Sequence, residues 1–487
     1  MINFVHKYKE FMEEKVNKIF FLLCLIASMS QAVKAQSVKE PTNVSALQDT
    51  FWSLSIQDAS TGGELVGIRS HHLMTPASTM KVVSTATALS IYPVSTRFET
   101  RIETDGEISN GVLNGNVYVI GDGDPSIGSR YFWREDAQKF FKSVAAALKE
   151  LGISKVTGGV VAISDKRDFQ AENPRWPLYD LGNHYAAGAF NLNLFDNSYT
   201  ARIVDSGQRV IVEPEVPELK LTTRFAQGSS RSRDSLYISR IPLSDGSFPI
   251  TGVYPSRAKS ITLRGSVPNP PLFVASNLQH FLRNSGVSFG ANASTQERSV
   301  AGMKNLYTFK SPTILELARI TNVYSHNLFA EGFLRLVGRD KVGMEGHNLS
   351  QTAIMEVMRY WSSRGLDVRE LEMLDGSGLS GENRVTANFL ASLLGKVYRS
   401  EMKDTFMRTL PRAGVEGTVT SFLKRTPLEG KAYLKSGTIR NVVCYTGYVE
   451  LDGKVYTVAF MVNNFYGRAS NIRGAMESIL LESFGLK

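Results

Sequence analysis

Four serines in this chain are followed by a lysine three residues later, a spacing that can support nucleophilic catalysis. The pairs are Ser78–Lys81, Ser256–Lys259, Ser400–Lys403 and Ser421–Lys424. A serine hydroxyl is a weak nucleophile that needs an adjacent base, and a lysine can be that base once burial or nearby positive charge lowers its pKa. Residues three apart on a helix lie on one face, with about 5–6 Å between Cβ atoms. Because the pattern occurs four times, only its surroundings can identify a catalytic pair.

Only the first pair stands at the start of a long apolar helical pattern. The segment TPASTMKVVSTATALSIY, residues 75–92, has a proline at its second position and apolar residues at helical spacing after it. A serine near a helix N-terminus directs its own backbone N–H outward, where it can stabilise an oxyanion. The other three pairs lack this context, so we expect Ser78 to be the nucleophile and Lys81 its base.

Two further short motifs support this choice. Ser325–Asn327 is the only Ser-x-Asn in the chain, and Lys435–Gly437 is the only Lys-(Ser/Thr)-Gly. The second lies in KAYLKSGTIR, a strand-like segment in which Thr438 follows the motif. Ser-x-x-Lys, Ser-x-Asn and Lys-Ser-Gly, in this order, form the signature set of penicillin-binding proteins and serine β-lactamases. Each motif alone is weak, and the three in order are specific.

The flanking sequence resembles one family among these proteins. DGSGLSGENRVT (375–386) and LPRAGVEGTV (410–419) are similar to signature stretches of the D-alanyl-D-alanine carboxypeptidase/endopeptidase family, the low-molecular-mass class C penicillin-binding proteins. VYVIGDGDPSI and WPLYDLGNHYAAGAFNLNLFDNS resemble that family's middle region. The long separation between the first two motifs is more than a simple β-lactamase needs. The resemblance implies extra domains inserted there, and it extends over essentially the whole mature chain.

Chemistry and resemblance together imply roles for the catalytic residues. Ser78 would attack the carbonyl between two D-alanines and become acylated, while Lys81 takes its proton. Ser325 would relay a proton to the leaving amine. Asn327 would hydrogen-bond the substrate and steady Lys81. No cofactor or metal enters this scheme, and the seven histidines show no H-E-x-x-H spacing.

The third motif would bind the substrate. Lys435 adds positive charge and Ser436 a hydroxyl, both suited to a terminal carboxylate. After Gly437, the N–H of Thr438 would join that of the nucleophile in an oxyanion hole. Two positions depart from the commonest family pattern, because Ser436 stands where threonine is common and His326 stands where a small polar or acidic residue is usual. Neither change removes a required group. His326 could add a titrating group near the site, but we expect it to be a spacer that points outward.

The pattern of strands and helices predicts one interrupted catalytic domain. The N-terminal part of the mature chain contains strand-like segments followed by a helix, and so does the C-terminal part. In the C-terminal part, Asp452-Gly453 predicts a hairpin. The residues between these two parts have a different pattern, with many short strand and turn signals. We therefore predict an α/β fold of the α+β type, a penicillin-binding or serine β-lactamase-like transpeptidase domain with an antiparallel sheet between helices. It would comprise residues 36–95 and 266–487, with 96–265 forming inserted strand-rich domains.

The N-terminus predicts export. Residues 19–30 form an apolar run after Lys15 and Lys18, and Val33-Lys34-Ala35 fits a signal peptidase site. The run is short for a membrane span, which needs about 20 apolar residues, so an uncleaved anchor is the weaker alternative. We expect residues 1–35 to be a signal peptide, and the mature protein to be periplasmic or otherwise extracytoplasmic, soluble or peripherally membrane-bound.

Composition excludes several other classes. The 487 residues are 43% hydrophobic and 21% charged, as in ordinary globular proteins. The net charge of +9 suits an anionic envelope or lipid surface, and without a Lys/Arg block interleaved with aromatics we expect no nucleic-acid partner. Cleavage would remove Cys24 and leave Cys444 alone, so an internal disulfide is excluded and this cysteine is expected to be a small buried hydrophobe.

We therefore expect an exported serine D-alanyl-D-alanine carboxypeptidase, or cross-link endopeptidase, that acts on peptidoglycan stem peptides and is inhibited by β-lactams. The alternative within the same fold is a β-lactamase or esterase, which differs in how fast water removes the acyl group. A third hypothesis, from another class, is an inactive wall-binding or scaffold protein. The intact motif residues argue against the third hypothesis. The sequence does not indicate an oligomeric state.

Overall fold

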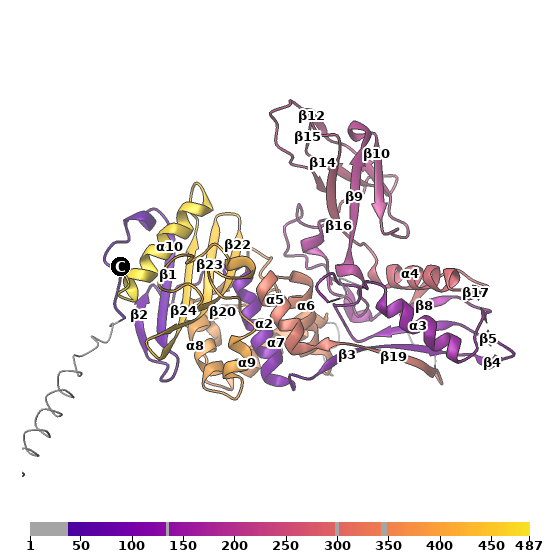
Figure 1. Ribbon diagram of the computed structural model, residues 1–487, viewed down its shortest axis with the longest axis horizontal. Coiled ribbons are helices and arrows are strands. Elements are labelled where there is room, and N and C mark those ends of the chain that lie inside the picture. Colours follow the sequence, from indigo (N-terminus) through magenta and orange to yellow (C-terminus); the bar gives the residue numbers. More distant parts are fainter. Residues whose placement is uncertain (1–37, 133–135, 298–300, 342–347) are drawn as a thin grey trace, which may run out of the picture.

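The computed structural model describes residues 38–132, 136–297, 301–341 and 348–487. Figure 1 shows two connected bodies: one contains both ends of the described chain, and the other is built from its middle. The predicted signal peptide, residues 1–35, lies outside the described residues. Among the helices that are described, none combines the length and the apolar character needed to cross a bilayer.

A five-stranded antiparallel sheet, in the order β2-β1-β24-β23-β22, forms the centre of the first body. Its strands are β1 (Phe51–Asp58), β2 (Glu64–Ile68), β22 (Ala432–Ile439), β23 (Val442–Leu451) and β24 (Lys454–Asn463), with the two-residue pair β20 (Leu371–Glu372) and β21 (Arg384–Val385) nearby. The predicted hairpin at Asp452-Gly453 joins β23 to β24. Both of these strands are buried along nearly their whole length, because helices cover both faces of the sheet. Cys444 lies fully buried in β23, as expected.

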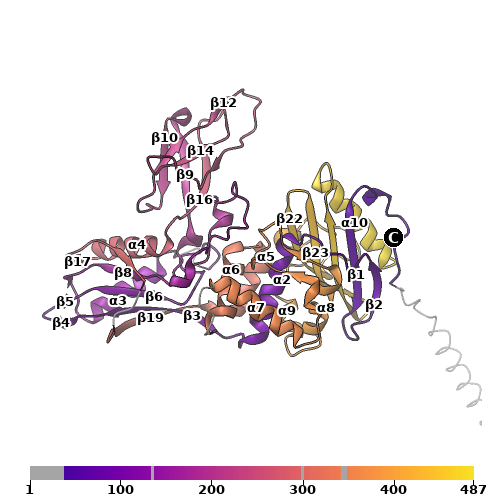
Figure 2. The same ribbon diagram turned by 180° about the vertical axis from the view of Figure 1, so that it is seen from behind.

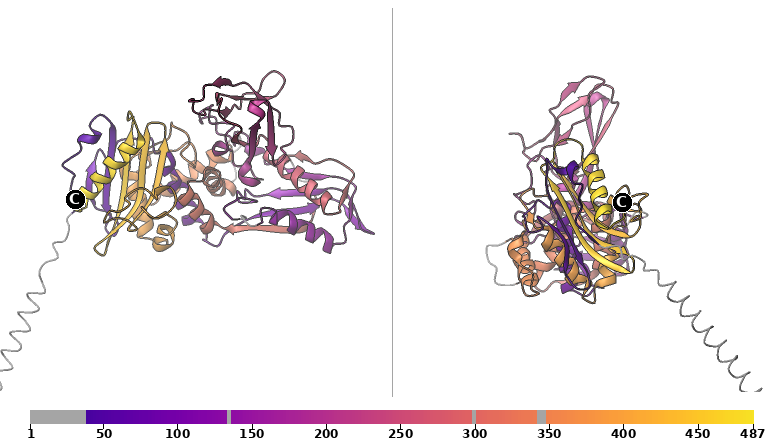
Figure 3. Two further views of the ribbon diagram at one scale, coloured as in Figure 1. Left: turned by 45° about the horizontal axis from the view of Figure 1, so that its top comes forward. Right: turned by 90° about the vertical axis from the view of Figure 1, so that its left-hand side faces the viewer.

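Helices pack on both faces of this sheet, as the end-on view in Figure 3 shows. They are α2 (Met80–Ile91), α5 (Ile314–Tyr324), α6 (Asn327–Arg339), α7 (Leu349–Ser362), α8 (Ala387–Tyr398), α9 (Lys403–Met407) and α10 (Ala469–Ser483). α10 packs on one face with Trp52 and Phe460 in its core, and the others share the core on the opposite face. α2 is central, since every residue from Met80 to Leu89 is buried. The predicted antiparallel sheet between helices is therefore confirmed.

The inserted body contains a mixed five-stranded sheet in the order β18-β8-β6-β3-β19 and several smaller sheets. Its inner elements are β3 (Arg97–Thr104), β4 (Glu107–Ser109), β5 (Val112–Asn114), β6 (Val117–Gly121), α3 (Lys139–Glu150), β7 (Lys155–Val156), β8 (Val160–Ile163), α4 (Pro270–Asn284), β17 (Ser288–Phe289), β18 (Ser294–Gln296) and β19 (Lys304–Thr313). The outer elements are β9 (Ser198–Val204), β10 (Arg209–Glu213), β11 (Leu221–Thr223), β12 (Ala226–Gly228), β13 (Tyr237–Ile238), β14 (Phe248–Thr251), β15 (Val253–Pro255) and β16 (Ile261–Ser266). These outer strands project beyond the rest of the molecule in Figures 1 and 2.

The end of the insertion differs from the predicted boundary at residue 266. Phe273 of α4 and Phe309 of β19 belong to the core of the inserted body, and β19 pairs with β3. The first body resumes at α5, where Ile314 enters its core. The segment PLFVASNLQHFLRNSG, residues 271–286, has helical periodicity and contains most of α4. A periodicity alone does not determine which of two cores the apolar face contacts, and this is why the boundary was misplaced.

Buried polar contacts join the two bodies. The Arg335 guanidinium on α6 forms a buried ion pair with Asp168 and also donates to the Ala189 carbonyl. Trp176 Nε1 donates to the buried carboxylate of Asp375 at 2.8 Å. The insertion is therefore attached to the catalytic body by specific buried contacts, which fix the orientation of one against the other.

We expect Arg335→Met to lower the free energy of unfolding by about 3–5 kcal/mol, because it leaves the Asp168 carboxylate buried without its counter-charge. Chemical denaturation of the two proteins measures this difference. Arg369→Met is the matched control and should leave stability unchanged. Arg369 forms an ion pair with Asp367 that is largely exposed. Equal stability of Arg335→Met and wild type would show that this ion pair does not hold the insertion in place.

Candidate active site

Ser78 lies at the point where a short 3-10 turn, Ala77–Thr79, leads into α2. Ala77 has a φ of +47°, a left-handed conformation that side-chain-bearing residues seldom adopt. Lys81 is one turn further on, on the same face, and its Nζ donates to Ser78 Oγ at 2.8 Å. The same Nζ donates to the Ser377 carbonyl at 2.6 Å. The predicted serine–lysine pair is thus in direct contact.

Burial sets the protonation state of this lysine. The Lys81 side chain is fully buried, which lowers its pKa from 10.5 to about 7, although the charges of Asp375 and Glu331 act in the opposite direction. At neutral pH a large fraction of the amine is therefore unprotonated and able to accept a proton. Burial is also the main cause at Lys435, where the charge of Lys81 lowers the pKa further.

Two buried carboxylates support Lys81, and sequence analysis did not identify them. Glu331 on α6 accepts the N–H groups of Gly376 and Ser377, at 3.1 and 2.8 Å. Asp375 accepts N–H groups of the loop that follows it, including that of Gly378 at 2.7 Å. Burial and the charge of Asp375 raise the pKa of Glu331 to about 7. Together they hold the 375–386 loop so that the Ser377 carbonyl faces Lys81.

The Ser-x-Asn motif forms the junction between α5 and α6. Ser325 is left-handed, with φ of +58°, and ends α5, while α6 begins at Asn327. Lys435 Nζ donates to Ser325 Oγ at 3.0 Å, so the second and third motifs are in contact. Asn327 Nδ2 donates to the backbone carbonyl of Tyr185, at 2.6 Å. We had expected Asn327 to contact Lys81, but this partner lies in the inserted body.

His326 does not point outward, which corrects the prediction from the sequence. Its side chain is 13% exposed, and Nε2 lies 3.4 Å from a carboxylate oxygen of Asp196. The ring also packs on Phe329 and on the edge of Tyr131, with centroids 4.2 and 5.3 Å apart. The backbone reverses at Ser325, and this turns the next side chain toward the inserted body. A three-residue motif viewed without its neighbours could not show this.

The Lys-Ser-Gly motif occupies β22, an edge strand of the sheet, directly beside Ser78. A Cβ atom at Gly437 would lie 2.6 Å from the Pro76 carbonyl and 3.0 Å from the Ser78 nitrogen, so only glycine permits this approach. The Ser436 carbonyl accepts from Lys435 Nζ at 2.6 Å and therefore faces the cleft. Backbone groups two residues apart on a strand point the same way, which directs the Thr438 N–H toward the same side.

The hydroxyls of this motif have partners that the sequence did not suggest. Ser436 Oγ donates to Thr418 Oγ1 at 2.7 Å, and Arg473 lies 3.5 Å from Thr438 Oγ1. Lys435 itself is fully buried, and its hydrogen bonds go to a hydroxyl and a carbonyl. Burial first, and then the charge of Lys81, hold the pKa of Lys435 well below its ordinary value. A carboxylate bound beside it would favour the charged form of this amine.

Ser78, Ser325, Asn327 and Thr438 line one cleft of about 510 Å³. Its walls are Ser78, Ser325, Asn327, Gly378, Leu379, Thr438, Ile439 and Arg440 from the first body, with Tyr179, Asp180 and Tyr185 from the insertion. The insertion thus completes one wall of the cleft without separating the motifs. Among the described residues there is no cluster of three or more His, Cys, Asp or Glu side chains arranged to hold a metal ion.

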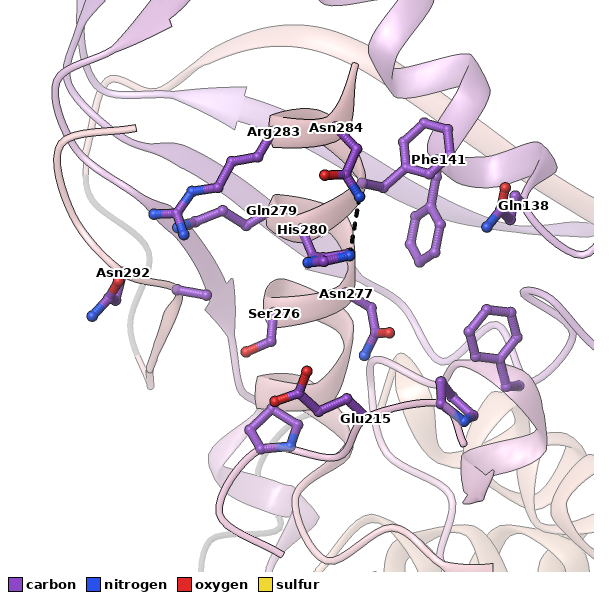
Figure 4. Close-up of a pocket in the computed structure, with 15 residues that line it drawn as sticks. Gln138, Phe141, Glu215, Ser276, Asn277, Gln279, His280, Arg283, Asn284 and Asn292 are labelled. Atoms are coloured by element: carbon purple, nitrogen blue, oxygen red, sulfur yellow. Dashed lines mark hydrogen bonds between the residues drawn. The ribbon is translucent and has the colours of Figure 1, made fainter. Parts of the chain in front are cut away.

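Another serine–lysine pair and a larger cavity have other surroundings. Ser400 Oγ donates to the Val397 carbonyl, and Lys403 lies over the Tyr398 ring. A larger hollow of about 590 Å³ follows the polar face of α4 in the insertion, where His280 and Asn284 are hydrogen-bonded (Figure 4). None of the motif residues lines it. The chemistry is therefore assigned to the smaller cleft.

Comparison with known proteins gives a consistent result. The profile of the D-Ala-D-Ala carboxypeptidase 3 (S13) family matches residues 34–482. A D-alanyl-D-alanine carboxypeptidase of Actinomadura sp. (strain R39) is 26% identical over 441 residues, which cover 86% of this chain and 78% of the relative. Penicillin-binding protein 4 of Haemophilus influenzae superposes with a TM-score of 0.78 at 21% identity, over 91% of this chain and 99% of that one. The same protein in complex with a β-lactam superposes over the same shares, at 21% identity and a TM-score of 0.73.

We expect Gly437→Ala to slow acylation by benzylpenicillin about 10²–10³-fold, because the added methyl group pushes β22 and its N–H away from the nucleophile. Stopped-flow measurement of the acylation rate tests this. Gly474→Ala is the control, since a Cβ there, on α10, would have no heavy atom within 4 Å. Unchanged acylation in Gly437→Ala would mean that the close approach of the strand is not needed for oxyanion stabilisation.

Proposed function

Since the chain belongs to the D-Ala-D-Ala carboxypeptidase 3 (S13) family, we propose that it is an exported enzyme that cleaves the D-alanyl-D-alanine end of peptidoglycan stem peptides through an acyl-serine. The observation that carries this proposal is the contact between Lys81 Nζ and Ser78 Oγ, 2.8 Å long, in which the pKa of the amine is lowered to about 7. The signal-peptide pattern of residues 1–35 supports export.

Acylation begins when Lys81 takes the hydroxyl proton of Ser78 and the oxygen attacks the carbonyl carbon of the penultimate D-alanine. Negative charge develops on the carbonyl oxygen, which accepts hydrogen bonds from the N–H groups of Ser78 and Thr438. When this intermediate collapses, the C–N bond breaks and the penultimate residue stays attached to the enzyme as an ester.

The leaving amine needs a proton, which Ser325 would supply. Its hydroxyl accepts from Lys435 Nζ at 3.0 Å, so its own proton can point into the cleft. The proton that Lys81 gained returns along this route to the departing D-alanine. Lys81 is then neutral again and can accept a proton from the water that hydrolyses the ester. One water is consumed, and one D-alanine and one shortened peptide are released.

Lys435 would anchor the terminal carboxylate of the substrate. It is buried, and its pKa is held low by burial and by Lys81, so in the empty cleft its charge is unfavourable. A bound carboxylate would favour the charged amine. Cleavage of a cross-link requires the same steps with a larger leaving amine, so endopeptidase activity is part of the proposal.

We expect benzylpenicillin to add its mass to the peptide that contains Ser78, and Ser78→Ala to abolish both this adduct and the release of D-alanine from a D-Ala-D-Ala pentapeptide, by at least about 10³-fold. Peptide mass spectrometry and a D-alanine assay measure the two effects. Ser400→Ala is the control and should behave as wild type. An adduct at Ser256, Ser400 or Ser421 would contradict the assignment, and rapid penicillin hydrolysis without D-alanine release would favour the β-lactamase alternative.

A further inference from the structure

A second hollow adjoins the cleft on the side of the Ser-x-Asn motif. It has a volume of about 200 Å³ and shares Tyr185, Ser325 and Asn327 with the cleft. Its other walls are Arg130, Tyr131, His184, Asp196 and Arg264 from the insertion, with Tyr324, His326 and Leu328 from the first body. A group attached to a substrate in the cleft could therefore enter it past the side chain of Asn327.

Two arginines line this hollow, and among the described residues the nearest carboxylate recorded for either is 4.0 Å away. Arg264, on β16, donates to Ser198 Oγ at 3.0 Å, and its nearest carboxylate, that of Asp196, is 4.0 Å away. Arg130 donates to the hydroxyl of Tyr131 at 2.9 Å and lies over that ring. Within the described ranges, neither guanidinium has a carboxylate at hydrogen-bonding distance.

Among the described residues that line the hollow, Asp196 is the one carboxylate. It also lies 3.4 Å from His326 Nε2. Burial and the nearby Arg264 charge lower the pKa of His184 to about 4, so that ring is neutral at pH 7. Burial first, and then the Arg130 charge, lower the pKa of Arg264. The hollow therefore has an excess of positive charge that an anion would relieve.

We propose that this hollow is a substrate subsite in which Arg130 and Arg264 bind a carboxylate of the stem peptide other than its C-terminal one. The subsite rests on the proposed function, because it assumes a peptide in the adjoining cleft. The planar guanidinium group matches a carboxylate with paired hydrogen bonds. A volume of about 200 Å³ has room for a carboxylate with a few adjoining atoms. The two arginines are thus specificity-determining residues.

Direct binding to the non-acylating Ser78→Ala protein tests the subsite. The probes are two D-Ala-D-Ala pentapeptides that differ only in one upstream group, the α-carboxylate of a γ-linked D-glutamate or its primary amide. We expect calorimetry to show the acid binding about 10- to 100-fold more tightly than the amide. Arg130→Gln and Arg264→Gln should each remove most of this preference and leave the affinity for the amide unchanged. Arg369→Gln, at an exposed position, is the control.

Two further measurements separate the possible outcomes. Arg264→Lys keeps the charge of the half-buried position, so it should retain part of the preference if the arginine contacts the carboxylate and is not needed merely for folding. In the active enzyme, Arg130→Gln should raise KM for the acid peptide while kcat changes little. Equal binding of acid and amide by the Ser78→Ala protein would overturn the subsite. If the active enzyme releases no D-alanine while the Ser78→Ala protein still binds the acid peptide more tightly than the amide, the proposed function is wrong and the subsite stands.

Discussion

The contact between a buried lysine amine and a serine hydroxyl is the constraint on which the rest of this structure depends. An ammonium group without solvent is costly, so the protein must either pair it or allow it to lose its proton. At Lys81 the two effects oppose each other. Burial favours the neutral amine, while Glu331 and Asp375 favour the charged one, and the resulting pKa is about 7. A general base works best when its pKa lies near the operating pH, and this balance provides it.

The surrounding architecture keeps that balance in place. α2 is buried along nearly its whole length, which fixes the lysine one turn from the nucleophile. The two carboxylates each hold backbone N–H groups of the 375–386 loop. Asp375 also accepts a hydrogen bond from Trp176. The inserted body therefore contacts one of the two carboxylates that act on Lys81. The insertion therefore stabilises the site as well as lining it with Tyr185.

Much of the first body could be predicted from the sequence because its signals are local. The serine–lysine spacing, the apolar run after Pro76 and the Asp452-Gly453 turn each involve residues close in the chain. Glu331 could not be found, because nothing near it in sequence marks it, and its role arises only when α6 packs against the 375–386 loop. The direction of His326 and the end of the insertion likewise depend on contacts between distant segments.

The most direct test of this account is the titration of Lys81 itself. In protein labelled with ¹³C at the lysine Cε atoms, the Lys81 signal can be assigned by its absence in Lys81→Met and followed by NMR across pH. Because folding lowers this pKa, the amine should lose its proton as the pH rises through about 7, and acylation by benzylpenicillin should speed up over the same range. A midpoint near the ordinary value of 10.5 would show that Lys81 is charged at neutral pH, and would contradict its assignment as the base.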